Sequence, residues 1–263
     1  MKSILDFQEK KNLKKKISMV TCYDYSFARL LASSEVDCML VGDSLAMTML
    51  GKSTTLDVSS DLMAVFTEAV VRGAGGKFVI ADLPFMSYRK GLTANMTSIE
   101  KVMKAGAQAV KLEGAAGNLK LIRHTVDSGV PVMGHLGLTP QSVNQLGGFK
   151  VQGRDEAAQR KIKEQALKLQ EAGCFSIVLE AVPSSLAAEI TASLDIPTIG
   201  IGAGIDCDGQ VLVLQDMLGM NQDFKPKFVK KYFEGADLMI KAFNNYHNEV
   251  ENGKFPTEKE SYS

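Results

Sequence analysis

Residues 109–134 read AVKLEGAAGNLKLIRHTVDSGVPVMG and contain one complete strand–helix–strand unit. The apolar run Ala109–Leu112 has the length of a strand that is buried on both faces. A helix is expected over Asn118–Ser128, because Gly129 supplies a stop signal and a second apolar run follows at Pro131–Gly134. Two strands joined through one helix run parallel, and the crossover between them is right-handed.

The same alternation repeats along most of the chain. Eight short apolar or β-branched runs are expected to be strands: Ile17–Cys22, Cys38–Val41, Phe78–Ala81, Ala109–Leu112, Pro131–Gly134, Phe175–Leu179, Pro197–Ile201 and Gln210–Leu214. The pattern predicts an α/β fold, a (β/α)8 TIM barrel, with a doubly wound open sheet as the alternative. We expect one domain over residues 1–263, with an N-terminal helical segment at about 1–16 and a C-terminal helical tail at about 226–263.

Composition narrows the functional class. The chain has 263 residues, and 30 Lys and Arg residues balance 30 Asp and Glu residues, which argues against nucleic-acid binding. No apolar run approaches the ~20 residues of a membrane span, and the lysine-rich start does not resemble a signal peptide, so a cytoplasmic location is expected. The four cysteines lack CxxC spacing, so any metal is expected on oxygen ligands.

Three local patterns yield further expectations. Leu62, Val65, Phe66, Ala69 and Val70 follow helical spacing, which predicts that this stripe of a helix over Asp61–Arg72 is packed. Thr97 and Glu100 have the spacing of a capping box that opens the next helix. The lysine cluster at residues 10–16 is expected to be a solvated face.

Acidic residues gather where the expected strands end. The residues at these points are Asp24, Asp43, Asp82, Glu113, His135, Glu180, the stretch Gly200–Gly204 and Asp216. A TIM barrel carries its functional groups on this face. A carboxylate at the end of a buried strand must contact water, a cation or a metal. Any single one of these acidic residues could instead cap a helix or a turn.

Lys111 and Glu113 are two positions apart on one expected strand, so their side chains share a face. Leu112 then points to the helices, and the two charged residues point into the barrel, where Glu113 is the expected partner of the lysine. Such a pair is either a structural ion pair or a lysine that holds a substrate anion beside a metal site.

The strand-end residues predict a particular chemistry. Asp43, Asp82 and Glu113 suit a hard divalent cation, with Mg²⁺ the first expectation. Such an ion can chelate a 2-oxo acid and make the neighbouring C–H acidic enough for a carboxylate base. Glu180, which ends the apolar run Ile177–Leu179 away from the metal set, is the predicted base. His135 could contact substrate or only hydrogen-bond its loop.

The chain resembles the ketopantoate hydroxymethyltransferase family. The segments that carry this resemblance, in family order, are Thr21–Asp24, Val41–Leu45, Ala81–Phe85, Val110–Gly114, Gly134–Ser142, Gly147–Arg154, Ile177–Glu180, Ile199–Gly204, Cys207–Val213 and Lys254–Pro256. The resemblance implies a (β/α)8 barrel that transfers a hydroxymethyl group from 5,10-methylenetetrahydrofolate to 3-methyl-2-oxobutanoate through a Mg²⁺-stabilised enolate. The product would be 2-dehydropantoate, on the way to pantothenate and coenzyme A.

The resemblance also assigns roles to residues. Asp43, Asp82 and Glu113 match magnesium positions, while Asp43, Ser44, Asp82 and Lys111 match positions that contact the oxo acid. Glu180 matches the general base, and His135 matches a residue of the substrate pocket. A homodecamer is expected from the family.

Two other readings stay open. A phosphoenolpyruvate mutase or isocitrate-lyase-like enzyme would also bind magnesium and an oxo acid in a barrel, although no cysteine-bearing catalytic loop of the lyase kind is evident. A barrel without catalytic activity could serve as a binding or assembly module.

Overall fold

The computed structural model describes residues 1–222 and 226–262 and contains a closed barrel of eight parallel strands. The strands follow one another around the barrel in chain order: β1 (Ile17–Thr21), β2 (Cys38–Val41), β3 (Phe78–Asp82), β4 (Ala109–Glu113), β5 (Val132–Gly137), β6 (Ser176–Glu180), β7 (Thr198–Ile201) and β8 (Gly209–Leu212). Each lies at a predicted run, and β1 pairs with β8 to close the sheet. The predicted TIM barrel is confirmed, and the open sheet is wrong.

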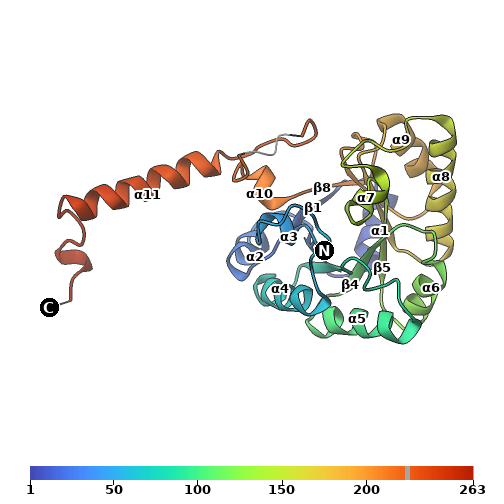
Figure 1. Ribbon diagram of the computed structural model, residues 1–263, viewed down its shortest axis with the longest axis horizontal. Helices are drawn as coiled ribbons and strands as arrows, with labels where there is room; N and C mark the ends of the chain where they lie inside the picture. Colours follow the sequence, from blue (N-terminus) through green and yellow to red (C-terminus); the bar gives the residue numbers. More distant parts are fainter. Residues whose placement is uncertain (223–225, 263) are drawn as a thin grey trace. The chain divides into compact units, whose positions relative to one another are not determined.

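Helices and shorter turns connect the strands. They are α1 (Ile4–Asn12), α2 (Tyr25–Ala32), α3 (Leu45–Thr48), α4 (Ser60–Gly73), α5 (Leu92–Lys104), α6 (Leu119–Asp127), η1 (Pro140–Ser142), α7 (Val143–Leu146), α8 (Glu156–Glu171) and α9 (Ser184–Ser193). Figure 1 shows α2, α4, α5, α6, α8 and α9 around the outside of the strands. The outer helices cover one side of the sheet, and strand side chains fill the inside, so the strands are buried on both faces.

The chain divides into two compact units, Met1–Leu212 and Val213–Ser263. The first contains the whole barrel. The second contains α10 (Leu214–Met217), α11 (Gly235–Glu251) and η2 (Glu258–Glu260), so the long helix of the predicted tail begins at Gly235 and not near residue 226. Ser263 lies outside the described residues. No helix in the part of the chain that the structure describes is both long and apolar enough to cross a membrane.

An aromatic cluster holds α1 against the strands. Phe7 of α1 is fully buried, and its ring lies 5.5 Å from the ring of Phe78 and 5.1 Å from that of Phe175. Phe78 begins β3 and Phe175 precedes β6, so both partners lie at the amino-terminal ends of strands. The N-terminal helix therefore closes the end of the barrel opposite the one that carries the acidic residues.

The lysines of residues 10–16 are not a solvated face throughout. Lys10 pairs with Asp37 at 2.5 Å, and Lys11 pairs with Asp208 at 2.8 Å. Lys16 donates to the carbonyl of Cys207 at 2.6 Å. The solvated-face prediction is wrong for Lys10 and Lys11, which are half-buried in ion pairs, and it holds for Lys14, Lys15 and Lys16, which are exposed.

Helix α4 buries a stripe that overlaps the predicted one only in part: Val70 is buried, while Leu62, Phe66 and Ala69 are half-buried. Its buried positions are Met63, Thr67, Val70 and Gly73, while Val65 is 63% exposed. A Cβ at Gly73 would lie 2.6 Å from the carbonyl oxygen of Tyr25, so this glycine lets α2 approach closely and sets the rotation of α4. Apolar spacing located the helix but not the face that packs.

The predicted capping box is also wrong. Helix α5 begins at Leu92, five residues before Thr97, and the Thr97 hydroxyl donates to the carbonyl of Thr93 within the helix. Cys22, Cys38, Cys174 and Cys207 are free and buried.

Candidate active site

Strand register brings four of the predicted site residues side by side. Asp82 on β3 is in register with Lys111 on β4, and Glu113 on β4 is in register with His135 on β5. Residues in register point to the same side of a sheet, so these side chains converge inside the barrel at the carboxyl ends of the strands. All four are buried, with exposed fractions of 5% or less.

Lys111 pairs with a neighbour that sequence spacing did not suggest. Its Nζ lies 2.8 Å from Asp82 Oδ1 and 3.4 Å from His135 Nδ1. Asp82 Oδ2 in turn accepts a hydrogen bond from the backbone N–H of Asp43 at 3.0 Å. The expected Lys111–Glu113 pair is therefore replaced by a Lys111–Asp82 pair, because adjacent strands in register are closer than two positions on one strand.

His135 lies between the two carboxylates that sequence analysis assigned to different roles. Its Nδ1 is 3.5 Å from Glu113 Oε1, and its Nε2 is 3.1 Å from Glu180 Oε2. Burial and the charge of Lys111 lower the pKa of His135, but Glu113 and Glu180 outweigh both and raise that pKa to about 9. The imidazole therefore lies between the predicted metal set and the predicted base.

Gln141 is a site residue that the sequence analysis missed. It is 5% exposed, and its Nε2 donates to Asp43 Oδ2 at 2.8 Å and to the carbonyl of Leu83 at 3.0 Å. Its Oε1 accepts from the Tyr88 hydroxyl at 2.6 Å, and its backbone N–H donates to Glu113 Oε2 at 3.0 Å. Its segment, Gly134–Ser142, was noticed as a motif without any role for this side chain.

Burial and the surrounding negative charge together shift the pKa values of two groups in the site. Burial raises the pKa of Asp43 well above its usual value, the charges of Asp82 and Glu113 raise it further, and Lys111 and Gln141 oppose the shift only in part. Burial lowers the pKa of Lys111, but Asp82, Asp43 and Glu113 outweigh this, so the net shift is upward. The ammonium is therefore firmly charged.

The three carboxylates fit a hard divalent cation in their chemistry. They supply only oxygen ligands, and all three are buried together at the carboxyl ends of β2, β3 and β4. Among residues 1–222 and 226–262, no three ligand-type side chains stand arranged around a metal position. The carboxylates instead accept hydrogen bonds from the protein. The Gln141 amide donates to Asp43, and the Asp43 N–H donates to Asp82.

Glu180 and Ser44 lie at the more open edge of this cluster. The Glu180 side chain is 17% exposed, against 3% for Glu113 and Asp82. The residue after it, Ala181, has a positive φ of 46°, a strained conformation for a residue with a Cβ. Ser44 Oγ lies 2.7 Å from the Tyr23 hydroxyl, one residue after Asp43.

Three strand-end candidates have structural roles. Asp24 accepts from the Phe27 N–H and caps α2, as the alternative reading allowed. Gly204 has φ +87°, and a Cβ there would lie 2.5 Å from Ser184 Cβ, so close packing against the start of α9 explains this glycine. Asp216 is part of α10 in the second unit, where Asn221 donates to it, and not of a barrel strand end.

A closed (β/α)8 barrel with buried acids, a lysine and a histidine at the carboxyl ends of its strands defines a TIM-barrel enzyme. The family model described as ketopantoate hydroxymethyltransferase matches residues 1–258. The chain belongs to the ketopantoate hydroxymethyltransferase family.

The chain is similar over its full length to named hydroxymethyltransferases. A 3-methyl-2-oxobutanoate hydroxymethyltransferase of Bdellovibrio bacteriovorus is 78% identical over 263 residues and all of both chains. One of Francisella tularensis subsp. tularensis is 55% identical over 262 residues, covering 100% of this chain and 99% of the relative.

The chain is similar in fold to solved structures of lyases and related enzymes. A phosphonopyruvate hydrolase in complex with oxalate and Mg²⁺ superposes with a TM-score of 0.64 at 10% identity, covering 99% of this chain and 93% of the other. A 2,3-dimethylmalate lyase has a TM-score of 0.61 at 15% identity, covering 100% and 92%. At this identity the match shows the fold alone, and the full-length relatives show the family.

Proposed function

We propose that the protein transfers a hydroxymethyl group from 5,10-methylenetetrahydrofolate to 3-methyl-2-oxobutanoate and releases 2-dehydropantoate and tetrahydrofolate. The observation that carries the proposal is the contact of Glu180 with His135, at the open edge of a buried cluster of carboxylates and one lysine. The names of the full-length relatives support the choice of substrate.

The carboxylates Asp43, Asp82 and Glu113 would hold Mg²⁺. A bound magnesium ion would polarise the ketone of the oxo acid and so acidify the C–H at C3. Lys111 supplies a fixed positive charge for the substrate carboxylate or the developing oxyanion, because its Nζ is already held beside Asp82. Ser44, next to Asp43, would donate to the same oxo acid, and its Oγ lies 2.7 Å from the Tyr23 hydroxyl.

Glu180 removes the proton from C3 in this proposal. Its greater exposure gives substrate access, and His135 keeps its carboxylate oriented by holding Oε2 at 3.1 Å. His135 thus contacts both Glu180, the proposed base, and Glu113, one of the proposed magnesium ligands. Through His135 the metal site and the base are linked. The resulting carbanion equivalent then attacks the methylene carbon of the folate, opened to an iminium. Water supplies the hydroxyl oxygen of the product, and the remaining carbon–nitrogen bond breaks as tetrahydrofolate leaves.

Proton–deuterium exchange at C3 of 3-methyl-2-oxobutanoate, followed by NMR in heavy water, tests the first half of the reaction. The wild-type protein should catalyse exchange that depends on Mg²⁺, and methylenetetrahydrofolate should then convert the substrate to 2-dehydropantoate. Glu180→Gln should keep oxo-acid binding but lose exchange, with the exposed-site variant Glu171→Gln as a control. Unchanged exchange in Glu180→Gln would exclude this residue as the base.

Assembly as a homodecamer stays a prediction, and light scattering of the purified protein in solution would test it.

A further inference from the structure

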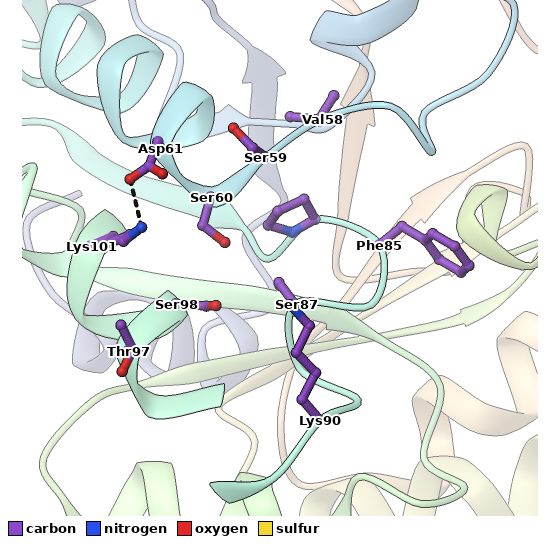
Figure 2. Close-up of a pocket in the computed structure, with 11 residues that line it drawn as sticks. Val58, Ser59, Ser60, Asp61, Phe85, Ser87, Lys90, Thr97, Ser98 and Lys101 are labelled. Atoms are coloured by element: carbon purple, nitrogen blue, oxygen red, sulfur yellow. Dashed lines mark ion pairs between the residues drawn. The ribbon is translucent and has the colours of Figure 1, made fainter. Parts of the chain in front are cut away.

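Tyr88 lies in the loop between β3 and α5 and is 4% exposed. The Ser87 N–H donates to the Pro84 carbonyl at 3.0 Å, and Met86 has φ +62°, so the chain turns sharply just before the tyrosine. In Figure 2, Ser87 and Lys90 of this loop line a pocket between α4 and α5, and Tyr88 is not among the residues of that pocket. The Tyr88 hydroxyl reaches the carboxylate cluster of the barrel instead.

The hydrogen-bond partners of the Tyr88 hydroxyl fix the direction of its proton. The backbone N–H of Glu113 donates to the hydroxyl oxygen at 3.3 Å, so the hydroxyl proton is directed to a different neighbour. That neighbour is Gln141 Oε1, which accepts the proton at 2.6 Å. Both hydrogen bonds are buried, so water does not compete with them and each is strengthened by the low local dielectric.

Tyr88 thereby helps to fix the side-chain amide of Gln141. With Oε1 facing the hydroxyl, Nε2 faces two acceptors, Asp43 Oδ2 at 2.8 Å and the Leu83 carbonyl at 3.0 Å. Only one orientation of the amide satisfies all three partners, because its oxygen accepts and its nitrogen donates. The amide occupies Oδ2 of Asp43, and no hydrogen bond to Oδ1 is found within the described residues. The amide therefore decides which oxygen of Asp43 is left for a ligand.

The same network holds Glu113, a second proposed magnesium ligand. The backbone N–H of Gln141 donates to Glu113 Oε2 at 3.0 Å, while the backbone N–H of Glu113 donates to the tyrosine. Arg89 braces the tyrosine, because its guanidinium lies 5.4 Å from the centroid of the Tyr88 ring and donates to the Glu113 carbonyl at 3.2 Å. The loop, the end of β4 and Gln141 are thus joined around one phenol.

We propose that Tyr88 is a positioning residue of the transferase site, which fixes Asp43 through the Gln141 amide and Glu113 through its backbone N–H for magnesium binding. Tyr88 itself touches neither the metal nor the reacting atoms. Loss of a group that orients a metal ligand commonly weakens metal binding or activity about 10–100-fold. The inference rests on the proposed function, because it concerns the carboxylates that would hold Mg²⁺ there.

Calorimetric titration of Mg²⁺ into the full chain, with 3-methyl-2-oxobutanoate present, tests the proposal. Tyr88→Phe removes only the hydroxyl and should raise the Kd of Mg²⁺ about tenfold relative to wild type. Ser176→Ala is the matched control, because Ser176 is fully buried at the start of β6 and its hydroxyl donates to the Pro197 carbonyl at 2.8 Å, at the other end of the barrel. This control should lower stability but leave the Kd unchanged.

The outcomes separate the inference from the function on which it rests. An unchanged Kd in Tyr88→Phe, or an equal rise in Tyr88→Phe and Ser176→Ala, would overturn the positioning role while the proposed function stands. A wild-type protein that binds no Mg²⁺ would contradict the proposed function, and this inference with it.

Two further readouts distinguish positioning from a general loss of stability. In the C3 exchange assay, the Mg²⁺ concentration that gives half the maximal rate should rise about tenfold in Tyr88→Phe, while the rate at saturating Mg²⁺ should change by about twofold or less. In a Gln141→Leu background, Tyr88→Phe should change the Kd of Mg²⁺ by about twofold or less, because the amide that carries its effect is already absent. Fully additive effects of the two substitutions would show that Tyr88 does not act through Gln141 and would overturn the proposal.

Discussion

Replacing Gln141 with leucine should destabilise the fold, although the two side chains are similar in size. The change removes the amide donor to Asp43 Oδ2 at 2.8 Å and to the Leu83 carbonyl at 3.0 Å, together with the acceptor for the Tyr88 hydroxyl at 2.6 Å. The backbone N–H of residue 141 keeps its bond to Glu113. The variant therefore isolates the side-chain amide.

The expected loss follows from the burial of these groups. A hydrogen bond to a buried charged group is worth about 1.5–3 kcal/mol, and one between neutral groups about 1 kcal/mol. Asp43 is 4% exposed, so water cannot replace the lost donor without opening the site. Extra apolar burial by leucine offsets part of this, which leaves a net loss of about 3 kcal/mol.

Urea unfolding followed by circular dichroism at pH 7 measures this loss. The midpoint should fall by about 1 M or more, given ordinary urea sensitivity. Gln145→Leu, on an exposed position four residues later, is the matched control and should change stability little. A Gln141→Leu protein as stable as Gln145→Leu would refute the argument that Gln141 holds the carboxylate cluster together.

Three further changes test other parts of the structure. Gly137→Ala should lower the free energy of unfolding in urea by about 3 kcal/mol or more, because Gly137 has φ +93° and an added Cβ would collide with the Glu180 carbonyl and Val182. Gly148→Ala should lower it less, because Gly148 also has a positive φ, +108°, but has open space around it. Ala181→Gly should stabilise the protein by about 0.5–1 kcal/mol in thermal unfolding, since it relieves a positive φ. Burial raises the pKa of Asp37, but hydrogen bonds from the Lys10 ammonium and the Ser18 N–H outweigh burial, so the net shift of this pKa is downward. The ionised Asp37 carboxylate therefore stabilises the fold above about pH 4, and this contribution is lost as the pH falls further. Asp37→Asn should therefore lower stability by about 2 kcal/mol at pH 7 and by much less at pH 3.

Each of these has a result that would contradict it. Equal losses for Gly137→Ala and Gly148→Ala would show that backbone strain alone is responsible, without the collision. A destabilised Ala181→Gly protein would mean that the lost side-chain contacts exceed the relieved strain. A constant difference between wild type and Asp37→Asn from pH 7 to pH 3 would rule out the ionised carboxylate as the source of the stability.

Local sequence predicted the strands and the strand-end acids well. Each buried strand is a short apolar run, and a run ends where the chain leaves the barrel, so Asp82, Glu113 and Glu180 could be placed from the sequence without knowledge of any long-range contact. Helix faces were less predictable. The packed stripe of α4 depends on Gly73 meeting α2, a contact that no pattern within α4 encodes.

The sequence alone determined the eight-fold alternation, the barrel, and which ionisable groups stand at its carboxyl-terminal end. Tertiary structure alone decided which of those groups meet. Lys111 pairs with Asp82, His135 joins Glu113 to Glu180, and Gln141 reaches Asp43 from 98 residues away. The reason is that secondary structure follows from periodicity along the chain, whereas partner choice follows from the register between strands and from the room left after the core is packed.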